Sequence, residues 1–421
     1  MKRFDAATWA ASPLSRRGLD LSRFQAERDV VVQICARVAA EGDAALRAYS
    51  AELDGWTPQS GETFEIHSGE FAAAAGRLDK QDRQALEFAA DRIREFHSRQ
   101  VETAKSASPG LELVTRPVRR AGLYAPGGRA AYPSTVLMTA IPARVAGVRE
   151  VVVATPPRAD GTVPDSILAA AHIAGVDTVY RMGGAQAIAA MAYGTQSIQR
   201  VDLIAGPGNV YVSLAKREVF GAVGIDGIAG PTEVMVIADA KARPDFVAAD
   251  LAAQLEHDPL AVAVLVTDSA MLASRVEEEL DSLLPGLERA DIIRAATCSA
   301  VVVRDLDEAM RIANEFAPEH LLIVTEDAAA RARQVENAGA VFVGPYATVP
   351  LGDYTAGPNH TLPTSGASRF ASPLGVRTFM KQMSVLSLDR GDVDALSGAT
   401  VRLAQMEGLG AHAHAVEVRL E

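Results

Sequence analysis

Long apolar runs are missing from this chain of 421 residues. No stretch reaches the roughly 18 consecutive apolar residues that a membrane-spanning helix needs. The N-terminus, from Met1 to Arg17, carries Asp5, Ser12 and Pro13 and has no unbroken apolar stretch of the kind found in signal peptides. We therefore expect a cytoplasmic protein without a membrane partner.

An excess of basic residues is also missing. Lys and Arg together number 41 against 53 Asp and Glu, which gives a formal net charge of −12 and a pI of about 5.3. Nucleic acids and anionic membranes are bound mainly by clustered Lys and Arg. We therefore do not expect a nucleic acid as the main partner.

Cysteine is scarce, because the chain has only Cys35 and Cys298. Both stand in apolar surroundings, where an unpaired cysteine behaves as a small core residue. Disulfides are rare in reducing compartments. We expect two free thiols in the protein core rather than one disulfide.

The regular features of the chain are helical stretches and short apolar runs. Its length suggests two to three domains. Residues 24–54 and 78–106 have apolar residues at helical spacing. Beyond residue 110, amphipathic stretches alternate with apolar runs at 151–154, 178–180, 201–205, 234–238, 262–266, 301–303, 321–324 and 340–343. This alternation predicts an α/β fold whose mostly parallel strands are covered on both faces and form two sheets. The last stretch, 375–421, is expected to be rich in helix, with helices at 375–383 and 396–406 around a strand at 384–388.

Glycine-rich turns stand at the ends of several predicted strands, at 122–128, 183–186, 206–209 and 230–232. None of them is a G-x-G-x-x-G, so the usual dinucleotide-binding fingerprint is absent. Glycine lets backbone N–H groups approach phosphate oxygens, and ligands of open α/β sheets bind outside the carboxyl ends of the strands. A phosphate-bearing ligand is one interpretation of these turns. Tight turns that need a positive φ are the other.

Residues suited to proton transfer or metal binding are scattered through the C-terminal half. They are Gln254 with His257, Glu319 with His320, Asp353 with His360, and Glu407 with His412. Histidine titrates near neutral pH and is a common metal ligand. Each group alone also suits an exposed turn, a helix cap or a helix C-terminus. Together they predict one site that is assembled from distant segments, as in an enzyme. His67, His97 and His172 are expected to be structural.

Taken together, these segments resemble the histidinol dehydrogenase family. The resemblance runs from about residue 24 to the C-terminus. It rests on motifs in the family's order: GLYAPGGR at 122–129, GGAQAIAAMAYGT at 183–195, GPGN at 206–209, QLEH at 254–257, APEH at 317–320, GDYTAGPNHTLP at 352–363 and EGLGAH at 407–412.

The resemblance implies two incomplete Rossmann-like domains with mostly parallel sheets, and small helical segments at the N- and C-termini. The larger domain would comprise residues 20–123 and 232–374 and carry the metal and catalytic residues. Residues 124–231 would form the NAD-binding domain inserted into it. Residues 1–19 would be an N-terminal segment, and 375–421 a dimerisation tail that reaches the active site of the partner subunit in a homodimer.

The resemblance also implies a role for each matching residue. The ligands of one zinc ion per subunit would be Gln254, His257, Asp353 and His412. Glu319 and His320 would be the acid/base pair, and Tyr124, Gln186 and Asn209 would contact NAD. The substrate L-histidinol would lie against Thr232, Gln254, His257, His320, Asp353, His360, Glu407 and His412. Three positions depart from the family: Thr232 stands where serine is usual, Leu255 stands where alanine is usual, and His414 is an additional histidine.

The implied reaction is the oxidation of L-histidinol to L-histidine through L-histidinaldehyde, with two molecules of NAD. Two other functions remain open from the sequence. One is a family paralogue that oxidises another small polar alcohol with NAD. The other is a zinc hydrolase in which Glu319 activates a metal-bound water. The ligand set is also compatible with Mn²⁺ or Co²⁺.

Overall fold

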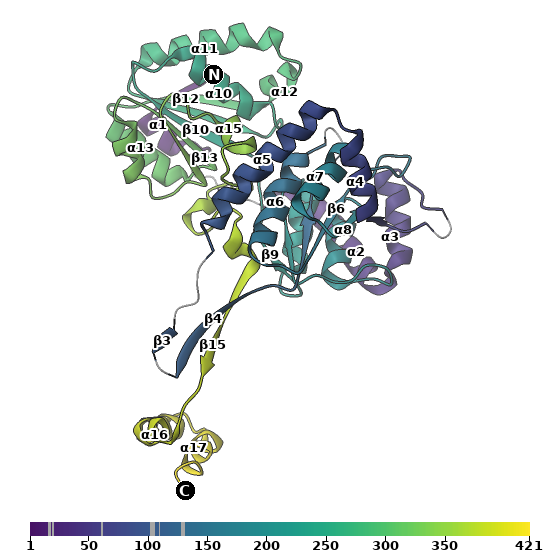
Figure 1. Cartoon of the computed structure of the whole chain (residues 1–421). Helices are drawn as coiled ribbons and strands as arrows, with labels where there is room; N and C mark the ends of the chain where they lie inside the picture. Colours follow the sequence, from purple (N-terminus) through teal and green to yellow (C-terminus); the bar gives the residue numbers. More distant parts are fainter. Residues whose placement is uncertain (16–17, 19–20, 60–61, 102–105, 109, 128–130) are drawn as a thin grey trace. The chain divides into compact units, whose positions relative to one another are not determined.

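The computed structural model describes the chain except residues 16–17, 19–20, 60–61, 102–105, 109 and 128–130 (Figure 1). The chain divides into two compact units. The first comprises Met1–Val101 and Val118–Phe379, and the second comprises Glu102–Pro117 and Met380–Glu421. Within the described ranges, no helix is both long and apolar enough to cross a membrane.

One sheet of the first unit is six-stranded and parallel throughout, with the order β1-β12-β11-β10-β13-β14. We call it the first sheet. Its strands are β1 (Lys2–Asp5), β10 (Glu233–Ala238), β11 (Val262–Thr267), β12 (Thr297–Val302), β13 (His320–Val324) and β14 (Ala340–Val343). The helices in this part are α1 (Ala6–Ala11), α10 (Pro244–Leu255), α11 (Ala270–Leu283), α12 (Ala290–Ala295), α13 (Leu306–Phe316), α14 (Ala328–Arg331) and α15 (Val349–Tyr354).

The first sheet is buried on both faces. Along β10, Val234 and Val236 point into one apolar core, whereas Met235 and Ile237 point into another. Because successive side chains of a strand point to opposite faces, a strand covered on both sides must be apolar at every position. This explains why β10 appears in the sequence as a continuous apolar run.

The other sheet of the first unit has the order β2-β7-β6-β5-β8-β9, and only β2 is antiparallel to its neighbour. We call it the second sheet. Its strands are β2 (Glu65–His67), β5 (Arg120–Tyr124), β6 (Glu150–Thr155), β7 (Thr178–Arg181), β8 (Leu203–Ala205) and β9 (Gly224–Ile225). The helices in this part are α2 (Gln25–Glu41), α3 (Asp43–Tyr49), α4 (Ser68–Arg77), α5 (Lys80–Ser98), α6 (Pro133–Val145), α7 (Asp165–Ala174), α8 (Gly184–Tyr193) and α9 (Val210–Val219).

The segment before residue 124 contributes much of the second sheet's packing. Helix α2 contacts α8 and α9, and its Val31, Ile34 and Val38 are buried in the same core as Ile188 of α8. Strand β2 pairs with β7. This part of the 20–123 segment therefore lies with the 124–231 segment, because its apolar face is buried there. Cys35 belongs to this core, and both cysteines are free.

The second unit is small. Strands β15 (Met380–Leu386), β4 (Leu111–Pro117) and β3 (Ser106–Ser108) form an antiparallel sheet in that order. Helices α16 (Arg390–Met406) and α17 (Gly410–Glu417) contact each other (Figure 1). Only Ala404 and Ala413 of these two helices are buried.

The predicted α/β class with mostly parallel sheets is confirmed. One local prediction was wrong. The stretch 375–383 is a 3₁₀ turn at Val376–Phe379 followed by strand β15, because residues 380–386 pair with β4. The N-terminal segment starts with β1, which adds an edge strand to the first sheet although Lys2, Arg3 and Asp5 are polar.

Removing a large apolar side chain from the core of the first sheet should destabilise the protein. Phe316 is 1% exposed and packs 6.0 Å from the Trp9 ring. We expect Phe316→Ala to lower the free energy of unfolding in urea by about 3–5 kcal/mol. Phe88→Ala is the matched control, since Phe88 is 58% exposed. Similar losses in both variants would contradict this assignment of the core.

Candidate active site

The candidate acid/base residues lie at the amino edge of the first sheet. Strand β13 begins at His320, and its neighbour β10 begins at Glu233. The two strands are parallel, and Val234 is paired with His320. Residues 232–233 therefore lie beside residues 319–320. The turn at 230–232 is at the amino end of its strand, not at the carboxyl end where ligands of such sheets were expected.

Glu319 is buried and well hydrogen-bonded. Its Oε2 accepts hydrogen bonds from the Thr232 hydroxyl at 2.5 Å and from the Glu233 backbone N–H at 2.9 Å. Burial raises the pKa of the Glu319 carboxyl, although His320 and these two donors act in the opposite direction. The carboxyl group therefore binds a proton more readily than an exposed glutamate does.

The His320 ring is held so that one nitrogen stays free. Its Nδ1 lies 3.2 Å from the Glu233 carbonyl oxygen, and because a carbonyl can only accept, Nδ1 carries the hydrogen. Nε2 lies 3.7 Å from Asp353 Oδ1, which is too far for a hydrogen bond, and it has no partner among the described residues. Nε2 is then the basic atom of the ring. Burial alone would lower the pKa of His320, but the Glu319 and Asp353 carboxylates raise it overall.

Gln254 reaches the same edge from α10. A helix that connects parallel strands runs back toward their amino ends, so the last turn of α10 lies near the start of β10 and β11. Gln254 is 1% exposed, and its Nε2 donates to the Thr232 hydroxyl oxygen. That hydroxyl in turn donates to Glu319. The carboxamide orientation is thus fixed, and Gln254 Oε1 is left buried without a partner in the described part of the chain.

Asp353, His360 and His257 interact electrostatically with one another, and Asp353 and His360 also do so with His320. Burial would raise the pKa of Asp353, but His320, His360 and His257 lower it overall. Burial lowers the pKa of His360. The Nδ1 atom of His257 lies 3.0 Å from the Ala253 backbone carbonyl oxygen. The Nδ1 atom of His360 lies 2.9 Å from the Asp353 backbone carbonyl oxygen. Each ring therefore keeps Nε2 as the nitrogen with a free lone pair, which is the arrangement common in metal-binding histidines.

Two predicted residues lie in the second unit. Glu407 follows α16, His412 belongs to α17, and both are exposed, as is the additional His414. Over the described ranges, no group of three or more His, Cys, Asp or Glu forms a metal-binding cluster. The predicted zinc set has only two such residues, His257 and Asp353, in the first unit, because its third member there is Gln254. The buried, unpartnered Oε1 of Gln254 fits the N/O donor set of a zinc site.

The residues expected to contact NAD lie at the carboxyl edge of the second sheet. Tyr124 ends β5, and its hydroxyl oxygen accepts a hydrogen bond from the Gly184 N–H at 3.0 Å. Burial raises the pKa of Tyr124 to about 12, so the hydroxyl stays a donor. Gln186, in the first turn of α8, is 1% exposed and its Oε1 has no partner among the described residues. Asn209 is the N-cap of α9 and accepts from the Val212 N–H.

Asp54 is a polar residue of this edge that the sequence did not reveal. Its carboxylate accepts hydrogen bonds from the Gly183 N–H and from Gln186 Nε2, both at 3.3 Å. Burial raises its pKa. In the sequence Asp54 stands at the end of an ordinary helical stretch, and only the tertiary structure brings it to the start of α8. Glu233, which is fully buried and positions both Glu319 and His320, was missed for the same reason.

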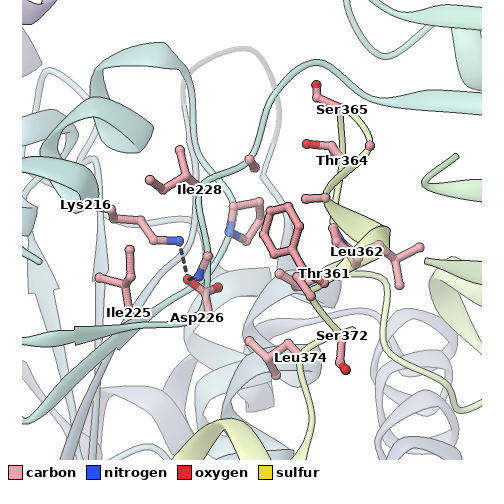
Figure 2. Close-up of a pocket in the computed structure, with 18 of the residues that line it drawn as sticks. Lys216, Ile225, Asp226, Ile228, Thr361, Leu362, Thr364, Ser365, Ser372 and Leu374 are labelled. Atoms are coloured by element: carbon pink, nitrogen blue, oxygen red, sulfur yellow. Dashed lines mark hydrogen bonds and ion pairs between the residues drawn. The ribbon is translucent and has the colours of Figure 1, made fainter. Parts of the chain in front are cut away.

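A cavity of about 640 Å³ lies beside chain segments that also carry candidate site residues. It is lined by residues 206–207 and 225–229, and by much of 361–374. Figure 2 shows Lys216 and Asp226 on one wall and Thr361, Thr364 and Ser365 on the opposite wall. Its walls lie next in sequence to Asn209, Thr232 and His360, although none of these three lines it.

Comparison with known proteins shows which family the chain resembles over its length. The family model of histidinol dehydrogenase matches residues 19–420. The chain is 50% identical to the histidinol dehydrogenase of Moorella thermoacetica, over 98% of this chain and 97% of that protein. It is 47% identical to that of Parasynechococcus marenigrum, over 94% and 91% of the two chains.

A solved structure extends the similarity to the fold. The crystal structure of histidinol dehydrogenase from Elizabethkingia anophelis superposes with a TM-score of 0.91 at 33% identity, covering 100% of this chain and 98% of that one. A family match over almost the whole length, with these identities, leaves one conclusion. The chain belongs to the histidinol dehydrogenase family.

Proposed function

We propose that the protein oxidises L-histidinol to L-histidine, the last step of histidine biosynthesis, with NAD as the hydride acceptor and one zinc ion per subunit. The observation that carries this proposal is the buried Glu319–His320 pair, in which His320 Nε2 lies 3.7 Å from Asp353 Oδ1 and has no hydrogen-bond partner among the described residues. The family membership supports the substrate.

His320 acts as the general base. Nε2 takes the hydroxyl proton of histidinol while the carbon-bound hydride passes to the nicotinamide of NAD, which gives the aldehyde. The same transfer from the hydrated aldehyde gives the carboxylic acid and a second NADH. General acid–base help of this kind contributes roughly 10²–10⁴-fold to a rate. The Glu233 carbonyl keeps the ring in the tautomer that this role needs.

Glu319 acts between the two oxidations. Its Oε2 is occupied by Thr232 and the Glu233 N–H, and Oε1 is available to a water molecule. The raised pKa makes the carboxylate a better base. It takes a proton from the water as this adds to the aldehyde carbonyl, and the proton held by His320 Nε2 passes to the carbonyl oxygen. This gives the gem-diol and leaves Nε2 free to take a proton in the second oxidation.

Gln254, His257 and Asp353, together with His412, would hold the zinc ion. A zinc ion there supplies positive charge and coordination sites that orient the imidazole and amino nitrogens of the substrate. Thr232, His360 and Glu407 would contact the substrate as well, and Tyr124, Gln186 and Asn209 would contact NAD. A zinc hydrolase in which Glu319 activates a metal-bound water is not favoured. It would not account for the family membership, and it would give Tyr124, Gln186 and Asn209 no role.

The second unit would complete the site of a partner subunit in a homodimer. Its helices expose Leu396, Leu403 and Met406, at 53%, 58% and 71%. Large apolar side chains gathered on so small a unit favour burial against another chain. We also propose a cytoplasmic location, where the free thiols of Cys35 and Cys298 stay reduced.

The stoichiometry tests the reaction. Two NADH should form for each histidinol consumed, because both oxidations occur on one enzyme. Turnover of histidinol without NAD, or a clear preference for another amino alcohol, would contradict the proposed function.

The zinc ligands can be tested by elemental analysis. We expect His257→Ala to lose bound zinc, because it removes the ring whose Nε2 would be a zinc ligand. His172→Ala is the control, since His172 lies on α7 in the other part of the unit. Full zinc occupancy in His257→Ala would contradict the ligand set.

The roles of the acid/base pair can be separated by measuring the two half-reactions. His320→Asn should lose about 10²–10⁴-fold in turnover of both histidinol and histidinaldehyde, with zinc binding intact. Glu319→Gln should slow the oxidation of the aldehyde more than that of the alcohol, because it affects the hydration of the aldehyde. Equal, small losses in both half-reactions would rule out these roles.

A shared site predicts complementation between inactive chains. In a twofold dimer of His320→Asn and His412→Ala chains, one site receives both native residues and the other receives both substitutions. Re-associated mixtures should therefore regain activity, while each variant alone stays inactive. No activity in confirmed heterodimers would mean that His412 acts within its own chain.

A further inference from the structure

Lys216 and Asp226 form a buried ion pair beside the cavity (Figure 2). Lys216 lies on α9, and Asp226 directly follows β9. The two side chains are only 4% and 7% exposed. Buried charges are costly unless they are paired and hydrogen-bonded, so their other partners indicate what the pair does.

Both charges hold the backbone of one residue, Gly206. Lys216 Nζ donates to the Gly206 carbonyl oxygen at 3.1 Å, and the Gly206 N–H donates to Asp226 Oδ2 at 2.8 Å. The other carboxylate oxygen of Asp226 accepts from the Gly227 N–H at 2.8 Å. Both polar groups of the Gly206 backbone are therefore fixed by the same ion pair.

The backbone of Gly206 also lies close to the backbone of Tyr124. It has a φ of +120°, and a Cβ there would lie 2.3 Å from the Tyr124 backbone oxygen. The turn that begins at Gly206 ends at Asn209, the N-cap of α9. Lys216 stands seven residues after Asn209, which is about two turns of the helix. The ion pair thus fixes a turn that touches Tyr124 at one end and presents Asn209 at the other.

Stability gives no sufficient reason for this pair. Replacing a buried ion pair by apolar side chains of similar volume is often neutral or stabilising. Apolar residues such as Ile225, Ile228 and Leu362 also line the adjoining cavity, so an apolar side chain at position 216 would be accommodated. The specific effect of the ion pair is that it fixes the position of the Gly206 backbone.

We propose that Lys216 and Asp226 are positioning residues for the dinucleotide. They act through Gly206, by holding the 206–209 turn against Tyr124 so that Asn209 faces the cofactor. This inference rests on the proposed function, in which Tyr124 and Asn209 contact NAD.

The test is the affinity for NAD of the full-length, zinc-loaded double variant Lys216→Met/Asp226→Asn. This variant keeps the shape of the side chain at position 226, places an unbranched side chain one atom shorter at position 216, and removes both charges. We expect its dissociation constant for NAD, measured by calorimetry, to rise by about ten- to a hundredfold, as for a displaced binding group. The KM for histidinol and the thermal unfolding midpoint should stay close to wild type. Arg217→Met is the matched control, because it removes an exposed charge from the same helix.

A double-mutant cycle distinguishes positioning from a general structural role. If the pair acts through the turn, adding Asn209→Ala to the double variant should weaken NAD binding by no more than about twofold further. A folded double variant with wild-type NAD affinity would overturn the proposal. So would equal losses of NAD and histidinol affinity with a lower unfolding midpoint.

Two further variants keep the outcome unambiguous. If the double variant does not fold, Asp226→Asn alone is measured with the same criteria, since it preserves the shape of the side chain. Asn209→Ala alone distinguishes a failure of the proposed cofactor contact from a failure of the positioning role. Wild-type NAD affinity in Asn209→Ala would contradict the proposed cofactor contact, whereas a weakened Asn209→Ala beside unaffected Lys216 and Asp226 variants would contradict only the positioning role.

Discussion

The parallel pairing of β10 with β13 is the contact on which the candidate site depends. It sets Val234 opposite His320 and thereby brings Thr232 and Glu233 to Glu319. The register is fixed by burial, because a shift of one residue would turn every side chain of a strand to the other face. Val236 and Leu322, farther along the same strands, are fully buried. The packing of the core therefore decides the distances between the residues that carry the chemistry.

Two polar residues of the site share one arrangement. In His320 and Gln254, one polar atom fixes the orientation of the side chain and another has no partner among the described residues. His320 holds the Glu233 carbonyl with Nδ1 and leaves Nε2, and Gln254 holds Thr232 with Nε2 and leaves Oε1. A buried polar atom without a partner costs about 1–3 kcal/mol. Such atoms persist where a ligand completes their hydrogen bonds or coordination, which is why Nε2 and Oε1 support the proposed substrate and zinc roles.

The two sheets use opposite edges. In the second sheet the turns after β5, β7 and β8 provide Tyr124, Gln186 and Asn209 at the carboxyl edge, as is usual for open α/β sheets. In the first sheet the residues before β10 and β13 lie at the amino edge, and the last turn of α10 returns to that edge with Gln254. The proposed cofactor contacts and the proposed catalytic residues thus lie on the same type of sheet. The polar residues stand before the strands in the first sheet and at or after the strand ends in the second sheet.

The sequence alone indicated the α/β class, which the structure confirms. It also named most of the candidate site residues, whose roles stay predictions. Strands buried on both faces must be apolar throughout, so β10, β11 and β13 were visible as runs, and Glu319 and His320 stood out as polar residues at the start of such a run. Strand β1 was not visible, because an edge strand with Lys2, Arg3 and Asp5 has no such run. The tertiary structure alone decided which nitrogen of His320 is free, and that Asp54, Glu233, Lys216 and Asp226 belong to the site's surroundings. The contact between Asp54 and Gln186 joins residues 132 positions apart, and a local pattern carries no information about a contact made only when two distant segments pack together.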